Sequence, residues 1–286
     1  MIACQAQHRN KLNTYKRVKT SMASLRVFFG KAPVSSITAG DISDYRAWRA
    51  TDHGVKDITI RHDLHNLSKF FHYAVKKNWR RDNPVEAEDI PSDAGAVRDH
   101  IFTPNEEKSY LGVAHLRLQD LCRLMLYQGC RPEELLESRI EHVDLERRYL
   151  KIAKSKSNAG ERTLRIRAES LEILSRLVQS SECGWLFPSE RSAAKKLSLS
   201  TCENWHVKAR AATKIPCVIY DWRHTFATRA VNAGMNLATL KDVLGHANLR
   251  SVMRYVHLSQ QDQDKAMEML SQPDGNRTKA SKQVSQ

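Results

Sequence analysis

Arginine, histidine and tyrosine residues recur at short intervals over residues 220–257. Arg223 and His224 come first, Gly245-His246 follows, and Tyr255 comes last. Arginine makes permanently charged, bidentate contacts with phosphate oxygens, and a tyrosine hydroxyl can attack phosphorus when cations and a base assist it. These residue types therefore allow phosphoryl transfer through a covalent tyrosine intermediate. For Tyr255 alone, the alternative is a tyrosine at the boundary of an apolar core.

Two short helices are predicted around these polar groups. Asn236 suits an N-cap, apolar residues recur over 237–244, and Gly245 suits the left-handed residue that ends a helix. Asn248 can cap a second helix. Its apolar stripe consists of Leu249, Val252, Met253 and Val256. At about 100° per residue, Tyr255 falls on the flank of that stripe, so we expect a half-packed ring and a hydroxyl that faces a cleft.

A second polar group lies at the junction of two predicted helices. One helix ends at Gly129, and Pro132 opens the next, with Arg131 just before its N-terminus. A guanidinium beside free backbone N–H groups is suited to bind phosphate. The alternative is an arginine that pairs with Glu134 or Glu137.

A β-hairpin is predicted over residues 148–167. Residues 149–152 and 162–166 alternate between apolar and polar side chains, and residues 158–160 supply a turn. Lys154 and Lys156 lie near the tip, where most lysines are simply solvated.

Taken together, the strings G-C-R-P-E-E-L-L, R-H-T-F-A-T-R, L-G-H and Y-V-H resemble the catalytic domain of the tyrosine recombinase, or phage integrase, family. The resemblance implies that Arg131 and Arg223 clamp a DNA phosphate. It also implies that His246 hydrogen-bonds this phosphate or helps in proton transfer. Tyr255 would be the nucleophile that forms a 3′-phosphotyrosine, and Glu134 would orient Arg131.

Other positions follow from the same resemblance. Tyr220 stands where the family has its first histidine, so one imidazole is absent from the expected catalytic set. In the family a hairpin lysine enters the minor groove and protonates the leaving oxygen. Its spacing to Arg162 favours Lys156, with Lys154 as the alternative. Arg162 and His224 are expected DNA contacts.

The implied chemistry needs no cofactor and no metal. The phosphotyrosine linkage stores the bond energy, so rejoining requires no ATP. The six cysteines are scattered and form no C-x-x-C pair, which argues against a zinc site and suggests reduced thiols in a cytoplasm.

The N-terminal part is predicted to be helical, over residues 12–29, 42–49 and 57–78. The third helix offers a basic face with Arg61, His65 and Lys69, which is either solvated or in contact with DNA phosphates. This layout, which ends in K-N-W-R-R-D-N-P, resembles the SAM-like core-binding domain of the same family.

The expected architecture is therefore mainly α with a small antiparallel β-sheet, in two domains. A helical, SAM-like core-binding domain covers residues 1–87, and a linker covers 88–100. A mixed α+β catalytic domain covers 101–271, and a disordered tail covers 272–286.

Composition agrees with a nucleic-acid partner. The 286 residues carry a formal net charge of +14, with a pI near 9.6. No apolar run is long enough to cross a bilayer, and the first residues contain no secretory apolar region. We therefore expect a cytoplasmic protein with no membrane partner.

Three functions remain open at this point. The first is a site-specific recombinase that acts on double-stranded attachment sites, as a homotetramer on two DNA sites and as a monomer or weak oligomer when free. Accessory DNA-bending proteins fit that function. The second is a type IB topoisomerase, and the third is a DNA-binding relative without catalysis.

Overall fold

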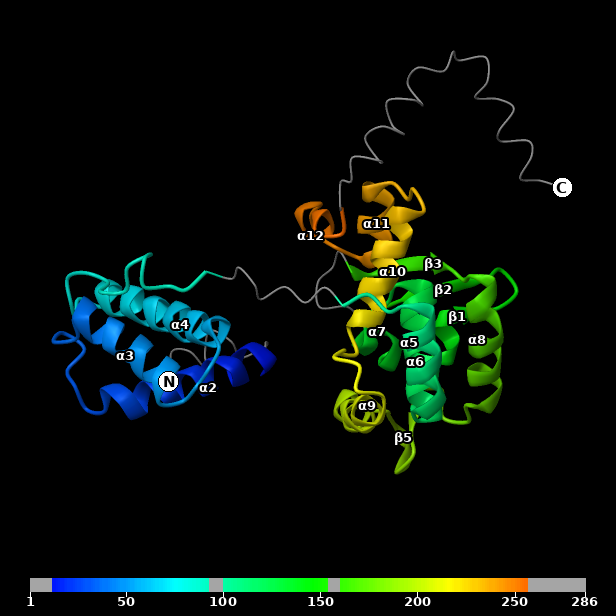
Figure 1. The fold of residues 1–286 in the computed structure, drawn as a ribbon, viewed down its shortest axis with the longest axis horizontal. Helices are drawn as coiled ribbons and strands as arrows, with labels where there is room; N and C mark the ends of the chain where they lie inside the picture. The colour runs from blue at the N-terminus through cyan, green and yellow to red at the C-terminus, as the bar shows by residue number, and fades with distance from the viewer. Residues whose placement is uncertain (1–11, 93–99, 154–159, 257–286) are drawn as a thin grey trace, which may run out of the picture. The chain divides into compact units, whose positions relative to one another are not determined.

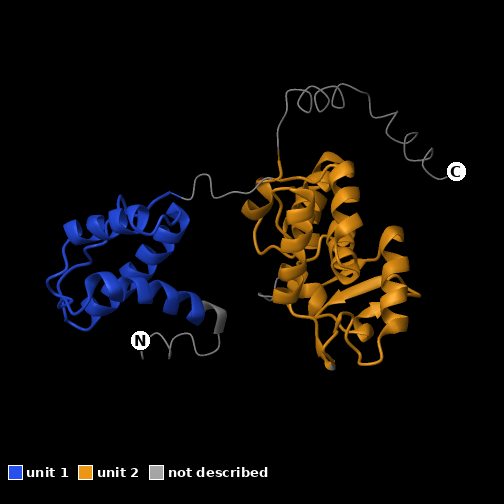
Figure 2. Ribbon diagram, turned by 60° about the horizontal axis from the view of Figure 1, so that its bottom comes forward, with its two compact units in different colours: residues 1–98 blue, residues 99–286 orange. Residues whose placement is uncertain are grey.

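The computed structural model describes residues 12–92, 100–153 and 160–256. The chain divides into two compact units, Met1–Arg98 and Asp99–Gln286 (Figure 2). The described parts are mostly helical, with two small antiparallel sheets, which confirms the predicted fold class. Every helix in these parts is too short or too polar to cross a membrane.

The described part of the first unit contains α2 (Leu12–Phe29), α3 (Ala39–Thr51) and α4 (Asp57–Lys76). Helix α3 begins three residues before its predicted start because Thr38 and Asp41 form a capping box. The Thr38 hydroxyl accepts from the Asp41 backbone N–H, and the Asp41 carboxylate accepts from that of Thr38. Helix α4 ends before its predicted end at Asn78, which has a left-handed backbone with φ 58°.

The core of the first unit forms where these helices meet. Tyr45 and Phe71 are fully buried in it, and Val85 and Ile90 pack against it from the segment after α4. The first residues of the predicted linker therefore lie against the core of this unit.

The second unit is built from the following described elements: α5 (Pro104–Val113), α6 (Leu116–Gln128), α7 (Pro132–Leu136), η1 (Ile140–His142), β1 (Val143–Asp144), β2 (Tyr149–Ile152), β3 (Arg162–Arg165), α8 (Ala168–Ser180), β4 (Pro188–Ser189), β5 (Ser192–Lys196), α9 (Leu199–Thr213), α10 (Asp221–Asn232), α11 (Leu237–Leu244) and α12 (Arg250–Met253). Helix α6 runs through the middle of this unit, with α10 on one side and α8 on the other (Figure 1). Helices α11 and α12 pack against one another, and α11 contacts both α10 and β3.

The strands β1, β2 and β3 form one antiparallel sheet in that order. Ile152 pairs with Arg162 across the predicted hairpin. Its tip, with Lys154 and Lys156, lies outside the described residues, as does the predicted tail over 272–286. The β4–β5 hairpin was not predicted, because its two short strands show no alternation of apolar and polar side chains.

Candidate active site

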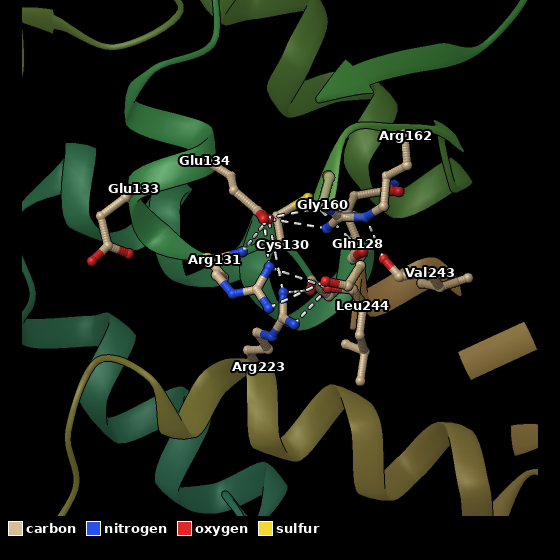
Figure 3. A network of polar contacts seen from close by, with 12 residues as sticks. Gln128, Cys130, Arg131, Glu133, Glu134, Gly160, Arg162, Arg223, Val243 and Leu244 are labelled. Carbon is tan, nitrogen blue, oxygen red and sulfur yellow. Dashed lines mark hydrogen bonds and ion pairs between the residues drawn. The ribbon is translucent and has the colours of Figure 1, made fainter. Parts of the chain in front are cut away.

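Three arginines from distant parts of the second unit converge on the carboxylate of Glu134 (Figure 3). Arg131 Nη1 donates to Glu134 Oε1 at 2.7 Å. Arg162 Nη2 donates to Oε2 at 3.0 Å, and Arg223 Nη1 lies 3.8 Å from the same oxygen. The Glu134 side chain is only 3% exposed. One buried carboxylate therefore interacts with three positively charged guanidinium groups.

The charge on Glu134 depends on these neighbours. Burial alone would raise the pKa of this carboxyl group, but hydrogen bonds from Arg162 and the charges of Arg162 and Arg131 outweigh burial and hold the pKa below its usual value. Glu134 is therefore ionised at neutral pH.

Arg131 is fixed by the turn between α6 and α7. Gly129 ends α6 with a left-handed φ of 66°, and a Cβ at this position would clash with the Phe226 ring. The Arg131 backbone N–H donates to Glu134 Oε2 at 2.9 Å. The pairing with Glu134 that the sequence offered as an alternative is thus present, and the Arg131 side chain is still 25% exposed. Arg131 can be held by Glu134 and also face a ligand.

Arg223 projects from α10 and is almost fully buried, with its side chain 4% exposed. Its Nη1 donates to the Gly129 carbonyl at 2.8 Å, and its Nη2 donates to the Leu244 carbonyl at 2.7 Å. Burial, followed by the charge of Arg131, lowers the pKa of Arg223 to about 10. Arg223 therefore remains charged at neutral pH and ties α10 to the ends of α6 and α11.

His246 follows the end of α11 and lies against Arg223. Its Nε2 is 3.0 Å from Arg223 Nη2, and because a guanidinium can only donate, this imidazole nitrogen is the acceptor. Burial, followed by the charges of Arg223 and Arg131, lowers the pKa of His246 to about 4. The imidazole is therefore neutral and carries its proton on Nδ1. This buried Nδ1 has no hydrogen-bond partner in the described residues, so it can donate to a bound ligand.

Gly245 sets the position of His246 and lies in contact with two arginines of the site. Its φ is 64°, and a Cβ here would lie 2.8 Å from Arg162 Nη1 and 3.0 Å from the Gly160 Cα. Its carbonyl accepts from Arg131 Nη2 at 3.4 Å. Only glycine combines this backbone conformation with this close approach.

Tyr255 is more buried than predicted. It is 5% exposed, whereas Leu249 and Met253, which were predicted to be core residues, are 43% and 50% exposed. The prediction is wrong because α12 is a single turn, so the helical period does not extend to residue 255. The chain instead packs Tyr255 with Val252 against α10 and α11.

The Tyr255 hydroxyl lies 2.8 Å from His224 Nδ1. Burial raises the pKa of this hydroxyl, and the charges of Arg223, Arg254 and Arg131 oppose that effect. Tyr255 is thus within the electrostatic influence of the arginine group. His224, which was expected to contact DNA, lies against the expected nucleophile.

Two other candidate residues are hydrogen-bonded to other groups of the protein. The Tyr220 hydroxyl donates to the Glu133 carboxylate, and burial and this hydrogen bond raise its pKa. The Arg162 side chain is 8% exposed and donates to the Val243 carbonyl at 2.6 Å as well as to Glu134. The family resemblance implied a DNA contact for Arg162. In the structure, Arg162 instead binds the carboxylate of Glu134, which also binds Arg131.

The candidate DNA-binding residues of the first unit lie one turn apart on α4. Lys69 is exposed, and Arg61 donates to the Pro91 carbonyl at 2.6 Å. Burial, and then the charges of Arg61 and Lys69, lower the pKa of His65. Lys154 and Lys156, the two candidates for the leaving-group acid, are outside the described residues.

Within the described ranges, no cluster of three or more His, Cys, Asp and Glu side chains is arranged to bind a metal ion. The groups that can hold an anion are instead Arg131, Arg223 and the Nδ1–H of His246. Two charged donors and one neutral donor suit a phosphodiester, whose non-bridging oxygens gain negative charge in the transition state.

Comparison with known proteins gives the family. Residues 101–262 match the model of the phage integrase family, and residues 3–90 match the phage integrase SAM-like domain. The first match covers more than half of the chain. The chain therefore belongs to the phage integrase family of tyrosine recombinases.

Curated relatives and solved structures agree with this assignment. A tyrosine recombinase of Thermosipho africanus is 24% identical over 92% of this chain and 94% of its own. The tyrosine recombinase XerC of Alcanivorax borkumensis is 26% identical over 86% of this chain and 83% of its own. The Tn1549 transposon integrase in complex with transposon right end DNA has the same fold. Its TM-score is 0.79 at 21% identity, over 94% of this chain and 99% of that one.

Proposed function

We propose that this chain is a site-specific DNA recombinase, an integrase that cleaves and rejoins DNA strands through a 3′-phosphotyrosine at Tyr255. The main support is the convergence of Arg131, Arg223 and the His246 Nδ1–H close to a buried tyrosine hydroxyl. In the reaction, the tyrosine oxygen bonds to phosphorus and the 5′-oxygen leaves. Reversal of these steps with a new 5′-hydroxyl rejoins the strand.

Each group has a separate role in this proposal. Arg131 and Arg223 hold the non-bridging oxygens, His246 donates a hydrogen bond to one of them, and Glu134 keeps Arg131 in place. Removal of one such interaction typically costs about 2.7–4 kcal/mol of transition-state stabilisation. Lys156, or alternatively Lys154, protonates the departing 5′-oxygen. Tyr220, which donates to Glu133, contributes to the site indirectly.

We propose that residues 1–87 bind the core DNA site, with phosphate contacts from Arg61, His65 and Lys69. Residues 88–100 would link them to a catalytic domain over 101–271. The partner is a double-stranded attachment site, and the active assembly is a homotetramer on two DNA sites, formed from monomers or weak oligomers. A lambda integrase tetramer bound to a Holliday junction has a similar fold, with a TM-score of 0.73 at 19% identity, over 86% of this chain and 72% of that one. Accessory DNA-bending proteins fit the same assembly.

We also propose that the chain acts in the cytoplasm. Its five described cysteines are free thiols, and four of them are buried. Unpaired cysteines are typical of a reducing compartment.

The first test is a suicide-substrate assay without metal. Nicked candidate attachment DNA traps the covalent intermediate because the short cleaved end diffuses away. Wild type should give a covalent protein–DNA band that Tyr255→Phe lacks. Tyr110→Phe is the matched control, because Tyr110 is another buried tyrosine hydrogen-bonded to a histidine, His206. A wild-type chain that binds a verified site but forms no covalent band would contradict the proposal.

A further inference from the structure

Tyr255 and His224 are joined by a direct hydrogen bond. The hydroxyl oxygen lies 2.8 Å from Nδ1, and the two ring centroids are 5.7 Å apart. His224 lies on α10 next to Arg223, whose two terminal nitrogens donate to backbone carbonyls. The imidazole is therefore on a rigid support that also carries a phosphate-binding group.

The direction of this hydrogen bond follows from the state of Tyr255. Burial raises the pKa of the hydroxyl above its usual value near 10, so Tyr255 keeps its proton at neutral pH. The hydroxyl is then the donor, and His224 Nδ1 is the acceptor. A protonated phenol is a weak nucleophile, and its proton must leave as the oxygen attacks phosphorus.

We propose that His224 is the general base of this site, the catalytic residue that takes the proton of Tyr255; this step rests on the proposed function. The Tyr255 O–H bond breaks and its proton moves to His224 Nδ1. The phenolate oxygen forms a bond to phosphorus while the bond to the 5′-oxygen breaks. That oxygen takes the electron pair and a proton from the leaving-group lysine. In rejoining, His224 returns its proton to the tyrosine.

The neighbouring groups are less suited to this step. His246 Nε2 accepts a hydrogen bond from Arg223, and its pKa of about 4 makes it a weak base. Tyr220, one helical turn before His224, donates its hydroxyl proton to Glu133. Among these described groups, His224 Nδ1 is therefore the nitrogen that contacts the attacking oxygen.

The substitution His224→Asn distinguishes positioning of the Tyr255 hydroxyl from removal of its proton. The asparagine side chain can place a hydrogen-bond acceptor close to the position of Nδ1, but it cannot act as a base. We expect the rate of covalent-complex formation to fall by about 10²- to 10⁴-fold, with unchanged DNA affinity and thermal stability. His206→Asn is the matched control, because His206 Nδ1 also binds a tyrosine hydroxyl, that of Tyr110, at 2.6 Å. It should affect stability and leave the cleavage rate of the folded protein unchanged.

A second substrate distinguishes loss of the general base, His224, from loss of the lysine that protonates the leaving group. With sulfur in place of the bridging 5′-oxygen, the leaving group needs no proton. This substrate should restore the rate of whichever of Lys156→Ala and Lys154→Ala lacks the proposed acid, but it should not restore that of His224→Asn. Added imidazole should partly restore His224→Ala. Rescue of His224→Asn by the sulfur substrate would overturn the proposal, because His224 would then act on the leaving group.

The pH profile gives an independent readout. Because a general base acts only when it is deprotonated, the wild-type rate should rise with pH, and this rise should be absent in His224→Asn. The charges that act on Tyr255 are those of Arg223, Arg254 and Arg131. The nearby carboxylate of Glu133 accepts the hydroxyl proton of Tyr220. His246 is already neutral above pH 5. An unchanged profile or a wild-type rate in His224→Asn would overturn the inference, whereas failure of wild type to form the covalent band would instead overturn the proposed function.

Discussion

At the scale of single residues, Glu134 stabilises the arrangement of the three arginines. Its carboxylate accepts from Arg131 and Arg162 and lies near Arg223, while all of these groups are largely buried. Without this negative charge, three guanidiniums would face one another in a medium of low dielectric constant. The two arginines proposed to bind phosphate, Arg131 and Arg223, are therefore positioned by a residue that need not touch DNA.

The substitution Glu134→Gln should lower the free energy of unfolding by about 3–5 kcal/mol, because it leaves buried positive charges without their partner. Denaturant unfolding measures this loss. Glu141→Gln is the control, since Glu141 forms an exposed ion pair with Arg139, and pairs of this kind contribute about 0–1 kcal/mol. Equal effects of the two substitutions would contradict the role of Glu134.

The pH dependence of stability follows from the same residue. The folded pKa of Glu134 lies below its unfolded value near 4.5. Its contribution is therefore fully present above the unfolded pKa and is lost as pH falls through the folded pKa. In unfolding measured from pH 7 downward, wild type should lose more stability below about pH 4.5 than Glu134→Gln does. Parallel curves for the two proteins would show that Glu134 is not linked to acid unfolding.

At the scale of elements, the turn after α11 aligns the groups of the candidate active site. Gly245 ends this helix, and the carbonyls of Val243, Leu244 and Gly245 each accept from an arginine of the site. The end of one helix thus fixes three guanidiniums and the following histidine.

We expect Gly245→Ala to destabilise the fold by about 1–3 kcal/mol from its backbone strain and to cost more through the close approach to Arg162 and Gly160. It should also reduce cleavage of the suicide substrate. Gly234→Ala is the control, because Gly234 has a positive φ of 83° but open space around its Cα. If both variants lose the same stability and activity, close packing at Gly245 is unimportant.

At the scale of the whole molecule, each of the two units has its own hydrophobic packing. Helices α2 to α4 enclose the core of the first unit, and the described part of the larger unit contains two clusters, of which the smaller includes Tyr255. Of the residues on α4 that are proposed to contact DNA, Lys69 is exposed. The proposed catalytic groups all belong to the larger unit.

Replacement of both Arg61 and Lys69 by alanine should weaken DNA binding uniformly across sequences. The slope of log affinity against log salt should decrease by about 0.9 for each phosphate that the variant no longer neutralises. Binding titrations at several salt concentrations, performed in the Tyr255→Phe background, measure this slope without covalent capture. An unchanged slope would place the DNA on another face of the first unit.

The sequence by itself determined the local features. The N-cap at Asn236, the helix ends at Gly129 and Gly245, and the Pro132 start of α7 were all predicted, because each depends on the backbone preferences of one or two residues. The family resemblance was equally readable, because its motifs are short and keep their order along the chain.

Only the tertiary structure decided how these groups are used. Arg162 reaches Glu134 across 28 residues, and His224 reaches Tyr255 across 31, so neither interaction is visible in a local pattern. The burial of Tyr255 likewise depends on packing against α10 and α11 after α12 has ended. Spacing in the chain can place a side chain on a helix, but its charge partner and its exposure are set by elements that fold onto it.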